Sequence, residues 1–151
     1  MAASSSDEHF VSTAVSDESG GFIGANLVRR LLQADCLVTV YDNFSSGRFG
    51  YLDGLPVRVV EGDILDSDAL LRIVTEQDGV VHLAANSGVP QSIRAPRRDF
   101  ETNALGTLNL LEACRSCLPG HAVKFVMASS SAPLGRQKPP LREDVAPLPI
   151  S

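Results

Sequence analysis

The residues whose types and spacing best suggest chemistry are two glycines and an acid. Gly21 and Gly24 stand just before an apolar helical pattern, and Asp42 closes the β-branched run VTVYD. A dinucleotide site needs a strand, a tight glycine turn and a helix whose free N–H groups face the pyrophosphate. An acid at the end of the second strand, about 20 residues further on, binds the adenosine ribose. Asp42 meets that demand, so the spacing indicates a dinucleotide site.

A glycine pair alone is equally typical of a helix start beside a flexible loop, but three further features favour a dinucleotide site. Asp63 follows the run VVEG, where its carboxylate can reach an adenine amino group. The stretch HLAA at 82–85 ends another strand with small residues that let a flat ligand approach. Asn103 lies on the next helix. His82 and Asn103 also have plain structural explanations, as a satisfied strand-end residue and a tie between loops, so the prediction depends on the combined order and spacing.

The glycine turn itself carries an unusual acid. The stretch SDESGGFIG at 16–24 has Glu18 where the first glycine of a phosphate-binding turn is expected. A carboxylate there repels a negative pyrophosphate, because like charges a few ångströms apart destabilise each other. We therefore expect the affinity for a dinucleotide to be reduced.

The elements that position these residues alternate between strands and helices. Short β-branched runs at 36–41, 57–60, 79–84 and 123–128 predict buried strands of a parallel sheet. The candidate first strand, 10–16, carries more hydroxyls than a central strand usually does. The alternation predicts an α/β fold with a doubly wound, Rossmann-like parallel sheet.

Three helices are expected between these strands. The first packs one face through Ile23, Leu27 and Leu31, which fall four residues apart. The second covers 67–74 with Ser67 as its N-cap, and the third covers 104–114. Together they would cover the sheet.

Composition points to one globular domain. The chain has 151 residues, 44% of them hydrophobic, and a formal net charge of −5. An acidic chain offers no basic surface to nucleic acid or to an anionic membrane, so we expect neither partner. With no apolar run of membrane length and no signal peptide, we expect a cytoplasmic protein. The predicted organisation is a mobile leader at 1–10 and a partial cofactor domain at 11–151, in which the proline-rich stretch 132–151 is extended.

The cysteines and histidines do not suggest redox or metal chemistry. Cys114 and Cys117 form a C-x-x-C pair, but they close an apolar helix, whereas a redox pair sits at a helix start that lowers the thiol pKa. His9, His82 and His121 have no partner at ligand spacing, so no metal site is expected.

The chain resembles the extended short-chain dehydrogenase/reductases, in particular the NAD-dependent epimerases and dehydratases of nucleotide sugars of the UDP-glucose 4-epimerase type. The resemblance covers residues 20–151 through GFIGANLVRRLL, YDNFSSGR, EGDILD, VVHLAANSGVPQSI and ETNALGTLNLLEACR, and through the serine-rich segment ASSSAPLG. The family's glycine motif is T-G-x-x-G-x-x-G. Here Asp17 occupies the threonine position and Glu18 the first glycine position.

The resemblance implies a role for each candidate residue. The cofactor is NAD. Its phosphates would contact Phe22 and Ile23, its ribose Asp42 and Asn43, its adenine Asp63 and Ile64, and its central part Leu83, Ala84 and Ala85. Gly21, Gly24 and Asn103 complete the set of cofactor residues. The catalytic serine or threonine of the family maps to Ser130, with Ser131 as the alternative. The partner would be a nucleotide sugar.

The family's catalytic tyrosine, with a lysine four residues later, has no counterpart among these 151 residues. Tyr41 and Tyr51 are followed at that spacing by Ser45 and Leu55. The pair would come directly after Ser151, so we expect an N-terminal part that lacks the last strands and the C-terminal substrate domain and is inactive by itself. Its last strand would leave an apolar edge that favours self-association. The alternatives are a non-catalytic or inert fragment, and an NADP-dependent reductase of the same superfamily, which Asp42 disfavours.

Overall fold

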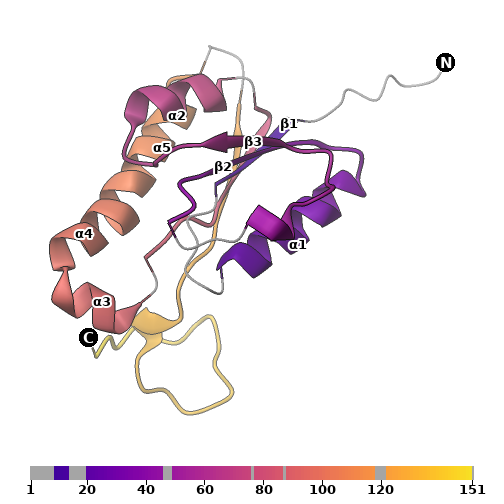
Figure 1. Cartoon of the computed structure of the whole chain (residues 1–151). Helices are drawn as coiled ribbons and strands as arrows, with labels where there is room; N and C mark the ends of the chain where they lie inside the picture. The colour runs from indigo at the N-terminus through magenta and orange to yellow at the C-terminus, as the bar shows by residue number, and fades with distance from the viewer. Residues whose placement is uncertain are drawn as a thin grey trace.

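A five-stranded parallel sheet with helices on both faces forms the centre of the molecule (Figure 1). The computed structural model describes residues 9–13, 20–45, 49–75, 77–86, 88–117 and 122–150. The strands are β1 (His9–Thr13), β2 (Leu37–Asp42), β3 (Arg58–Glu61), β4 (Gly79–His82) and β5 (Lys124–Met127). Their spatial order is β3–β2–β1–β4–β5, which confirms the expected α/β, Rossmann-like class.

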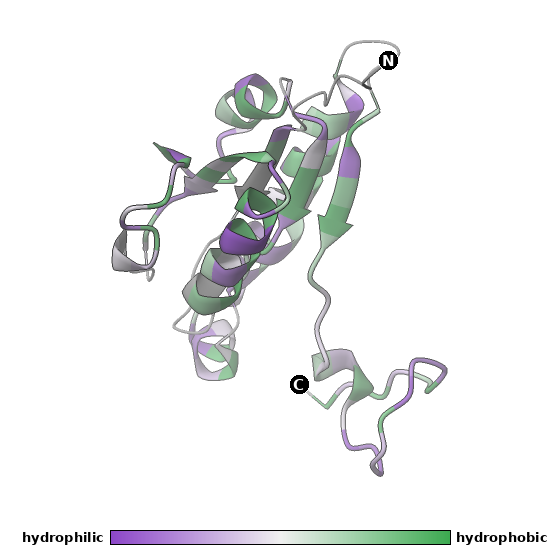
Figure 2. Cartoon of the chain, turned by 90° about the vertical axis from the view of Figure 1, so that its right-hand side faces the viewer, coloured by the Kyte–Doolittle hydropathy of each residue, from purple (hydrophilic) through white to green (hydrophobic). Residues whose placement is uncertain are grey.

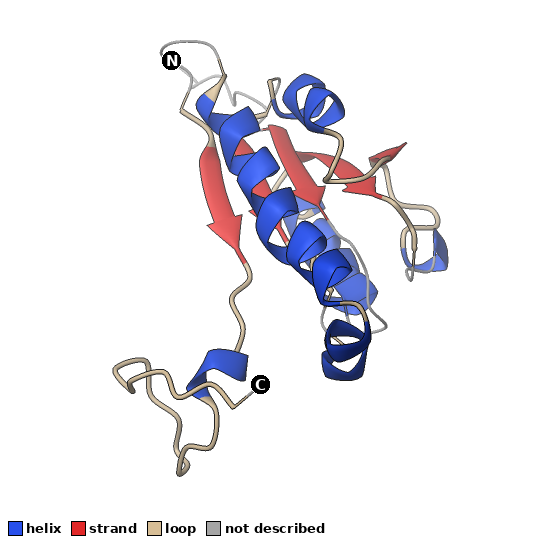
Figure 3. Ribbon diagram, turned by 90° about the vertical axis from the view of Figure 1, so that its left-hand side faces the viewer, coloured by secondary structure: helices blue, strands red, loops and turns tan. Residues whose placement is uncertain are grey.

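Helix α1 (Gly20–Leu32) covers one face of the sheet, and α2 (Ser67–Val74) and α5 (Gly106–Arg115) cover the other (Figures 1 and 3). Side chains of β2 pack against the helices on both faces of the sheet, because successive side chains of a strand point to opposite faces. Val38 and Val40 pack with Val28 of α1, while Tyr41 joins the larger core with Leu110 of α5. Within the described residues, no helix combines the length and apolar character needed to cross a membrane.

The first strand and the first two helices differ in detail from the sequence-based expectation. Strand β1 begins at His9, inside the range 1–10 for which the sequence predicts a mobile leader. Helix α1 packs through Ala25 and Val28, whereas Ile23 is 58% exposed. Ile23 lies in the first turn of the helix, where the small residues Gly24 and Ala25 form the buried face instead. The N-cap of α2 is Asp66 rather than Ser67, and its carboxylate accepts from the N–H of Ala69 at 2.9 Å.

A long helical segment precedes α5, where only a helix over 104–114 was expected. It consists of α3 (Val89–Arg94), α4 (Pro96–Phe100) and a π-helical turn, η2 (Glu101–Leu105), that continues into α5. Pro90 and Pro96 lie in the first turns of α3 and α4. Proline fits there because its missing N–H would have no partner inside the helix.

The segment after β5 leaves the sheet and folds back on itself (Figure 2). It contains a short 3-10 turn, η3 (Ala132–Leu134), and the N–H of Leu148 donates to the carbonyl of Pro133 at 2.9 Å. Gly135 has φ 62°, and a side chain there would meet the Leu148 carbonyl. The proline-rich stretch is therefore a closed loop with one glycine-dependent contact, lying beyond the end of the sheet.

Candidate functional site

The predicted cofactor residues gather at the carboxyl edge of the sheet. Chain order reverses direction around β1, because β2 and β3 follow on one side and β4 and β5 on the other. In open parallel sheets, ligands bind outside the carboxyl ends of the strands at such a switch point. Thr13 ends β1 level with Tyr41 of β2 and His82 of β4. The ends of these three strands therefore border one region.

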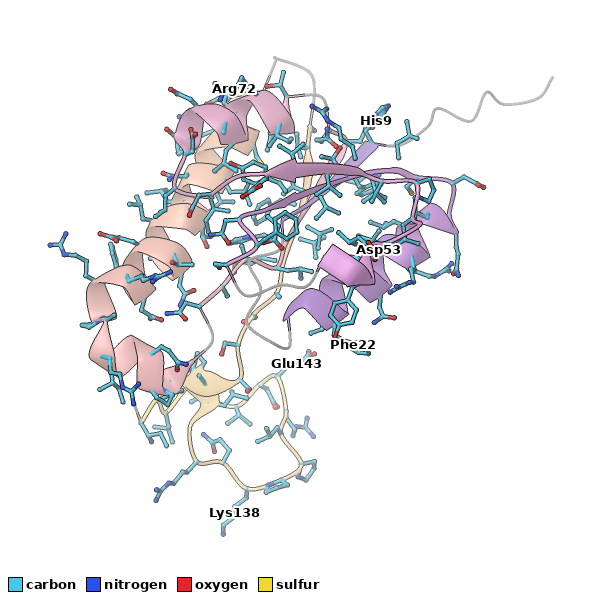
Figure 4. All side chains as sticks on the ribbon, in the orientation of Figure 1. His9, Phe22, Asp53, Arg72, Lys138 and Glu143 are labelled. Carbon is cyan, nitrogen blue, oxygen red and sulfur yellow. The ribbon has the colours of Figure 1, made fainter. Side chains whose placement is uncertain are left out.

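The start of α1 lies at the same edge, since this helix follows β1. Gly24 is buried, which fits a glycine that allows close packing of helix on strand. Phe22 and Ile23 are exposed in the first turn, where Figure 4 labels Phe22. The free N–H groups of a first turn favour an anion. Asp17 and Glu18 lie outside the described residues.

Asp42, at the end of β2, is a buried acid with few protein partners. Its side chain is 5% exposed, and Oδ1 accepts from the backbone N–H of Phe44 at 2.8 Å. Burial raises the pKa of its carboxyl to about 6, although hydrogen bonds from Phe44 and Asn43 oppose the shift. A buried carboxylate is costly without further partners. The hydroxyls of a ribose would supply them.

The loop after β3 carries the second acid. Both oxygens of the Asp63 carboxylate are held, Oδ1 by the N–H of Leu65 at 3.0 Å and Oδ2 by the side-chain amide of Asn43 at 3.1 Å. Asp63 itself is exposed, and Ile64 beside it is 1% exposed in the core. The loop thus offers a fixed carboxylate next to Asn43.

The end of β4 supplies small residues and a neutral histidine. Leu83 and Ala85 are half-buried, and Ala84 is buried. His82 is buried, and its Nε2 lies 2.8 Å from the hydroxyl of Thr107, which itself donates to the Asn103 carbonyl. Burial lowers the pKa of His82. This bonding fits the expectation of a satisfied strand-end residue rather than a catalyst.

Asn103 ties the loop after β4 to the helical segment. Its Oδ1 accepts from the N–H of Asn86 at 2.7 Å, and its Nδ2 donates to the Asn86 carbonyl at 3.0 Å. Asp99 accepts from the Asn86 side chain at 2.9 Å. Asn103 lies in η2, and π-helical turns are frequent at functional sites. The hydrogen bonds of Asn86 were not predicted, because no sequence spacing links this residue to Asp99 and Asn103, which it meets only through the fold.

The candidate catalytic serines lie beyond β5. The N–H of Ala128 donates to the His82 carbonyl at 3.0 Å, so the chain leaves β5 at the same edge as Leu83–Ala85. Ser130 and Ser131 follow and are exposed, and the Ser130 hydroxyl accepts from the N–H of Ala132 at 3.1 Å. The topology places them beyond the carboxyl edge of the sheet. The structure gives them no contact with Asp42 or Asp63.

Cys114 lies in α5, and Cys117 lies two residues after the end of this helix. Burial raises the pKa of the Cys114 thiol to about 11, and neighbouring Cys117 contributes to the shift. Burial also raises the pKa of Cys117. A thiol held protonated is a poor nucleophile. Among the described residues, no three His, Cys, Asp or Glu side chains are grouped so that they could hold a metal ion.

With this geometry in place, the comparison with known families is direct. Residues 19–151 match the family model described as "NAD dependent epimerase/dehydratase family". The chain therefore belongs to the NAD-dependent epimerase/dehydratase family, of the short-chain dehydrogenase/reductase type.

Curated relatives are nucleotide-sugar enzymes. The chain is 36% identical over 126 residues to a UDP-N-acetyl-alpha-D-glucosaminuronate decarboxylase of Bacillus cytotoxicus, covering 82% of this chain and 38% of the relative. It is 35% identical over 134 residues to a UDP-glucose 4-epimerase of Lacticaseibacillus casei, covering 87% and 39%. The chain thus spans less than half the length of these relatives.

Solved structures share the fold. A UDP-glucose 4-epimerase from Brucella ovis in complex with NAD aligns with TM-score 0.81 and 29% identity, over 95% of this chain and 42% of that one. A UDP-N-acetylglucosamine 4-epimerase from Methanobrevibacter ruminantium in complex with UDP-N-acetylmuramic acid aligns with TM-score 0.81 and 34% identity, over 96% and 45%.

Proposed function

We propose that this chain is the cofactor-binding N-terminal part of an NAD-dependent epimerase or dehydratase of nucleotide sugars. The observation that carries the proposal is the pair of acids at neighbouring strand ends, Asp42 buried and Asp63 fixed by Asn43. Asp42 and Asn43 would hold the adenosine ribose, and Asp63 with Ile64 the adenine. Phe22 and Ile23 would offer their N–H groups to the phosphates, and Leu83–Ala85 would contact the central part of NAD.

The proposed parent reaction divides the chemistry between cofactor and protein. NAD, when bound, supplies the hydride acceptor and donor for oxidation and reduction of a sugar carbon. The protein must move the proton of the sugar hydroxyl, and Ser130 can orient that hydroxyl. Tyr41 does not fit the role of proton carrier, because its side chain is 2% exposed and its hydroxyl donates to the carbonyl of Asp63. We therefore propose that these 151 residues are inactive on their own.

A second candidate function is a non-catalytic nucleotide-binding module. Glu18 in the glycine motif and the absence of a tyrosine–lysine pair at family spacing favour it. Such a module would bind its nucleotide at the same carboxyl edge of the sheet, but it would catalyse no reaction of a nucleotide sugar. The NADP-dependent alternative is disfavoured, because a carboxylate at Asp42 would repel a 2′-phosphate.

We also propose that the chain self-associates through β5 and is cytoplasmic. Strand β5 is an edge of the sheet, and Val126 and Met127 on it are 59% and 51% exposed. Unpaired apolar edges promote association of chains. Sedimentation of the wild type beside Val126→Lys tests this, since the charge should restore the monomer. The cytoplasmic location is a prediction from the sequence.

Calorimetric titration with NAD and NADP tests the proposed function. We expect NAD to bind at least about tenfold more tightly than NADP, because a desolvated like charge opposes the 2′-phosphate. Asp42→Asn should weaken NAD binding and reduce the difference in affinity between NAD and NADP. Asp35→Asn is the matched control, since Asp35 is exposed before the start of β2 with φ 58°, which asparagine tolerates. Binding of NADP as tight as that of NAD would contradict the assignment.

A further inference from the structure

The backbone of the loop after β3 is held from two sides by side chains outside the predicted cofactor set. The hydroxyl of Tyr41, in β2, donates to the carbonyl of Asp63 at 2.9 Å. The side-chain amide of Asn109, in α5, donates to the carbonyl of Ile64 at 3.2 Å. Two successive peptide groups of the loop are thereby tied to two different elements.

Packing reinforces both hydrogen bonds. The ring of Tyr41 lies so close to Gly62 that any side chain at this position would overlap it. In the same way, the side chain of Ile64 fills the space that a side chain at Gly106 would need. Tyr41 and Ile64 are almost fully buried. The loop therefore packs closely between β2 and α5 at Gly62 and Gly106, where only a glycine leaves enough space.

We propose that Tyr41 and Asn109 are positioning residues that fix the Asp63–Ile64 backbone for the adenine half of the cofactor. This inference rests on the proposed function, since it assumes that the adenine lies on this loop. The Asp63 carboxylate is oriented through the backbone, because its Oδ1 accepts from the N–H of Leu65 two residues on. A rotation of the Asp63 or Ile64 peptide would move both the carboxylate and the backbone groups that face the ligand.

The test uses Tyr41→Phe, which removes one oxygen and keeps the ring over Gly62. Tyr51→Phe is the matched control, because Tyr51 is exposed and its backbone carbonyl accepts from Arg29. Binding of AMP and of nicotinamide mononucleotide is followed by NMR titration of the whole chain, which separates the two halves of the cofactor. Loss of one buried hydrogen bond predicts about three- to tenfold weaker AMP binding. Nicotinamide mononucleotide binding should change less than twofold, as should both affinities in Tyr51→Phe.

A second readout is independent of any ligand. Amide hydrogen exchange of Leu65 in the free chain should accelerate in Tyr41→Phe, while amides in α1 keep their wild-type rates. Asn109→Ala should accelerate the same amide, and it decides the question if Tyr41→Phe fails to fold.

The outcomes separate this inference from the proposed function. Wild-type chain that binds neither AMP nor NAD contradicts the proposed function and this inference with it. Wild type that binds AMP, with unchanged affinity and unchanged Leu65 exchange in both variants, overturns the positioning role alone. An equal loss of affinity for AMP and nicotinamide mononucleotide would show general destabilisation and would also overturn it.

Discussion

The side-chain amide of Asn43 donates to the carboxylate of Asp63 across 3.1 Å, joining the ends of β2 and β3. The two residues are 20 positions apart in the chain, and parallel pairing brings them to one edge, since Asp42 pairs with Glu61. An amide at this position holds the acid without neutralising it. Under the proposed function, the carboxylate of Asp63 would be held in place for an adenine amino group.

Replacing that amide by an acid should weaken cofactor binding. Asn43→Asp places two carboxylates in contact, and like charges about 4 Å apart repel by roughly 4 kcal/mol at an effective dielectric of 20. Part of this is relieved by rotation of the side chains, so we expect NAD affinity to fall about tenfold at pH 7.5. Calorimetry measures the affinity, with Gln33→Glu, at an exposed position just after α1, as the charge control. Equal losses in both variants would mean that net charge, not the contact, is responsible.

The raised pKa of Asp42 predicts a pH-dependent stability. With a folded pKa of about 6 and an unfolded value of about 3.9, the folded chain binds more protons between these limits. The free energy of unfolding should therefore fall as pH rises from 4 to 6, by about 2 to 3 kcal/mol from this group. Asp42→Asn removes the effect, so its stability relative to wild type should increase between pH 4.5 and 7.5. Urea denaturation at both values checks this, and an equal difference at the two pH values would refute it.

The acid in the glycine motif predicts a gain of affinity on its removal. Glu18→Gly deletes a charge that repels the pyrophosphate, and we expect NAD to bind at least about tenfold more tightly. The melting temperature should change little, because the interaction of one acid with a helix start is worth only about 0.3 to 1 kcal/mol. Glu8→Gly, which removes the same charge outside the motif, serves as control. An unchanged dissociation constant would mean that the pyrophosphate lies elsewhere.

The chain should show no turnover on nucleotide sugars, even with saturating NAD. General acid–base catalysis by a placed group contributes about 10²- to 10⁴-fold, and this is lost without the tyrosine. Orientation of the sugar against the nicotinamide, worth roughly 7 to 11 kcal/mol of barrier, is lost as well if no further domain holds the sugar. A coupled assay with UDP-glucose, UDP-glucuronate and UDP-N-acetylglucosamine measures it. Turnover that survives repurification and disappears in Ser130→Ala would contradict this expectation.

Much of the sheet and the region of the site were predictable from sequence because they depend on local signals. The β-branched runs placed β2 to β5 within a residue or two, and Asp42 and Asp63 were located by their positions at strand ends. The exposure of Ile23 was not predicted, because a period of four residues does not show that the small residues Gly24 and Ala25 form the buried face at this level of the helix. The contacts of Tyr41 and Asn109 with the loop depend on packing between elements far apart in the chain. No spacing in the sequence encodes them.

The most direct test of the central claim, that the carboxyl edge of this sheet binds NAD, is backbone NMR of the labelled chain during titration with NAD. We predict saturable shifts at Asp42 and Asn43, at Asp63–Leu65 and at Leu83–Ala85, with little change at Lys138, which Figure 4 labels at the far end of the loop after β5. Shifts that are absent at saturating NAD, or that are confined to the loop after β5, would contradict the account.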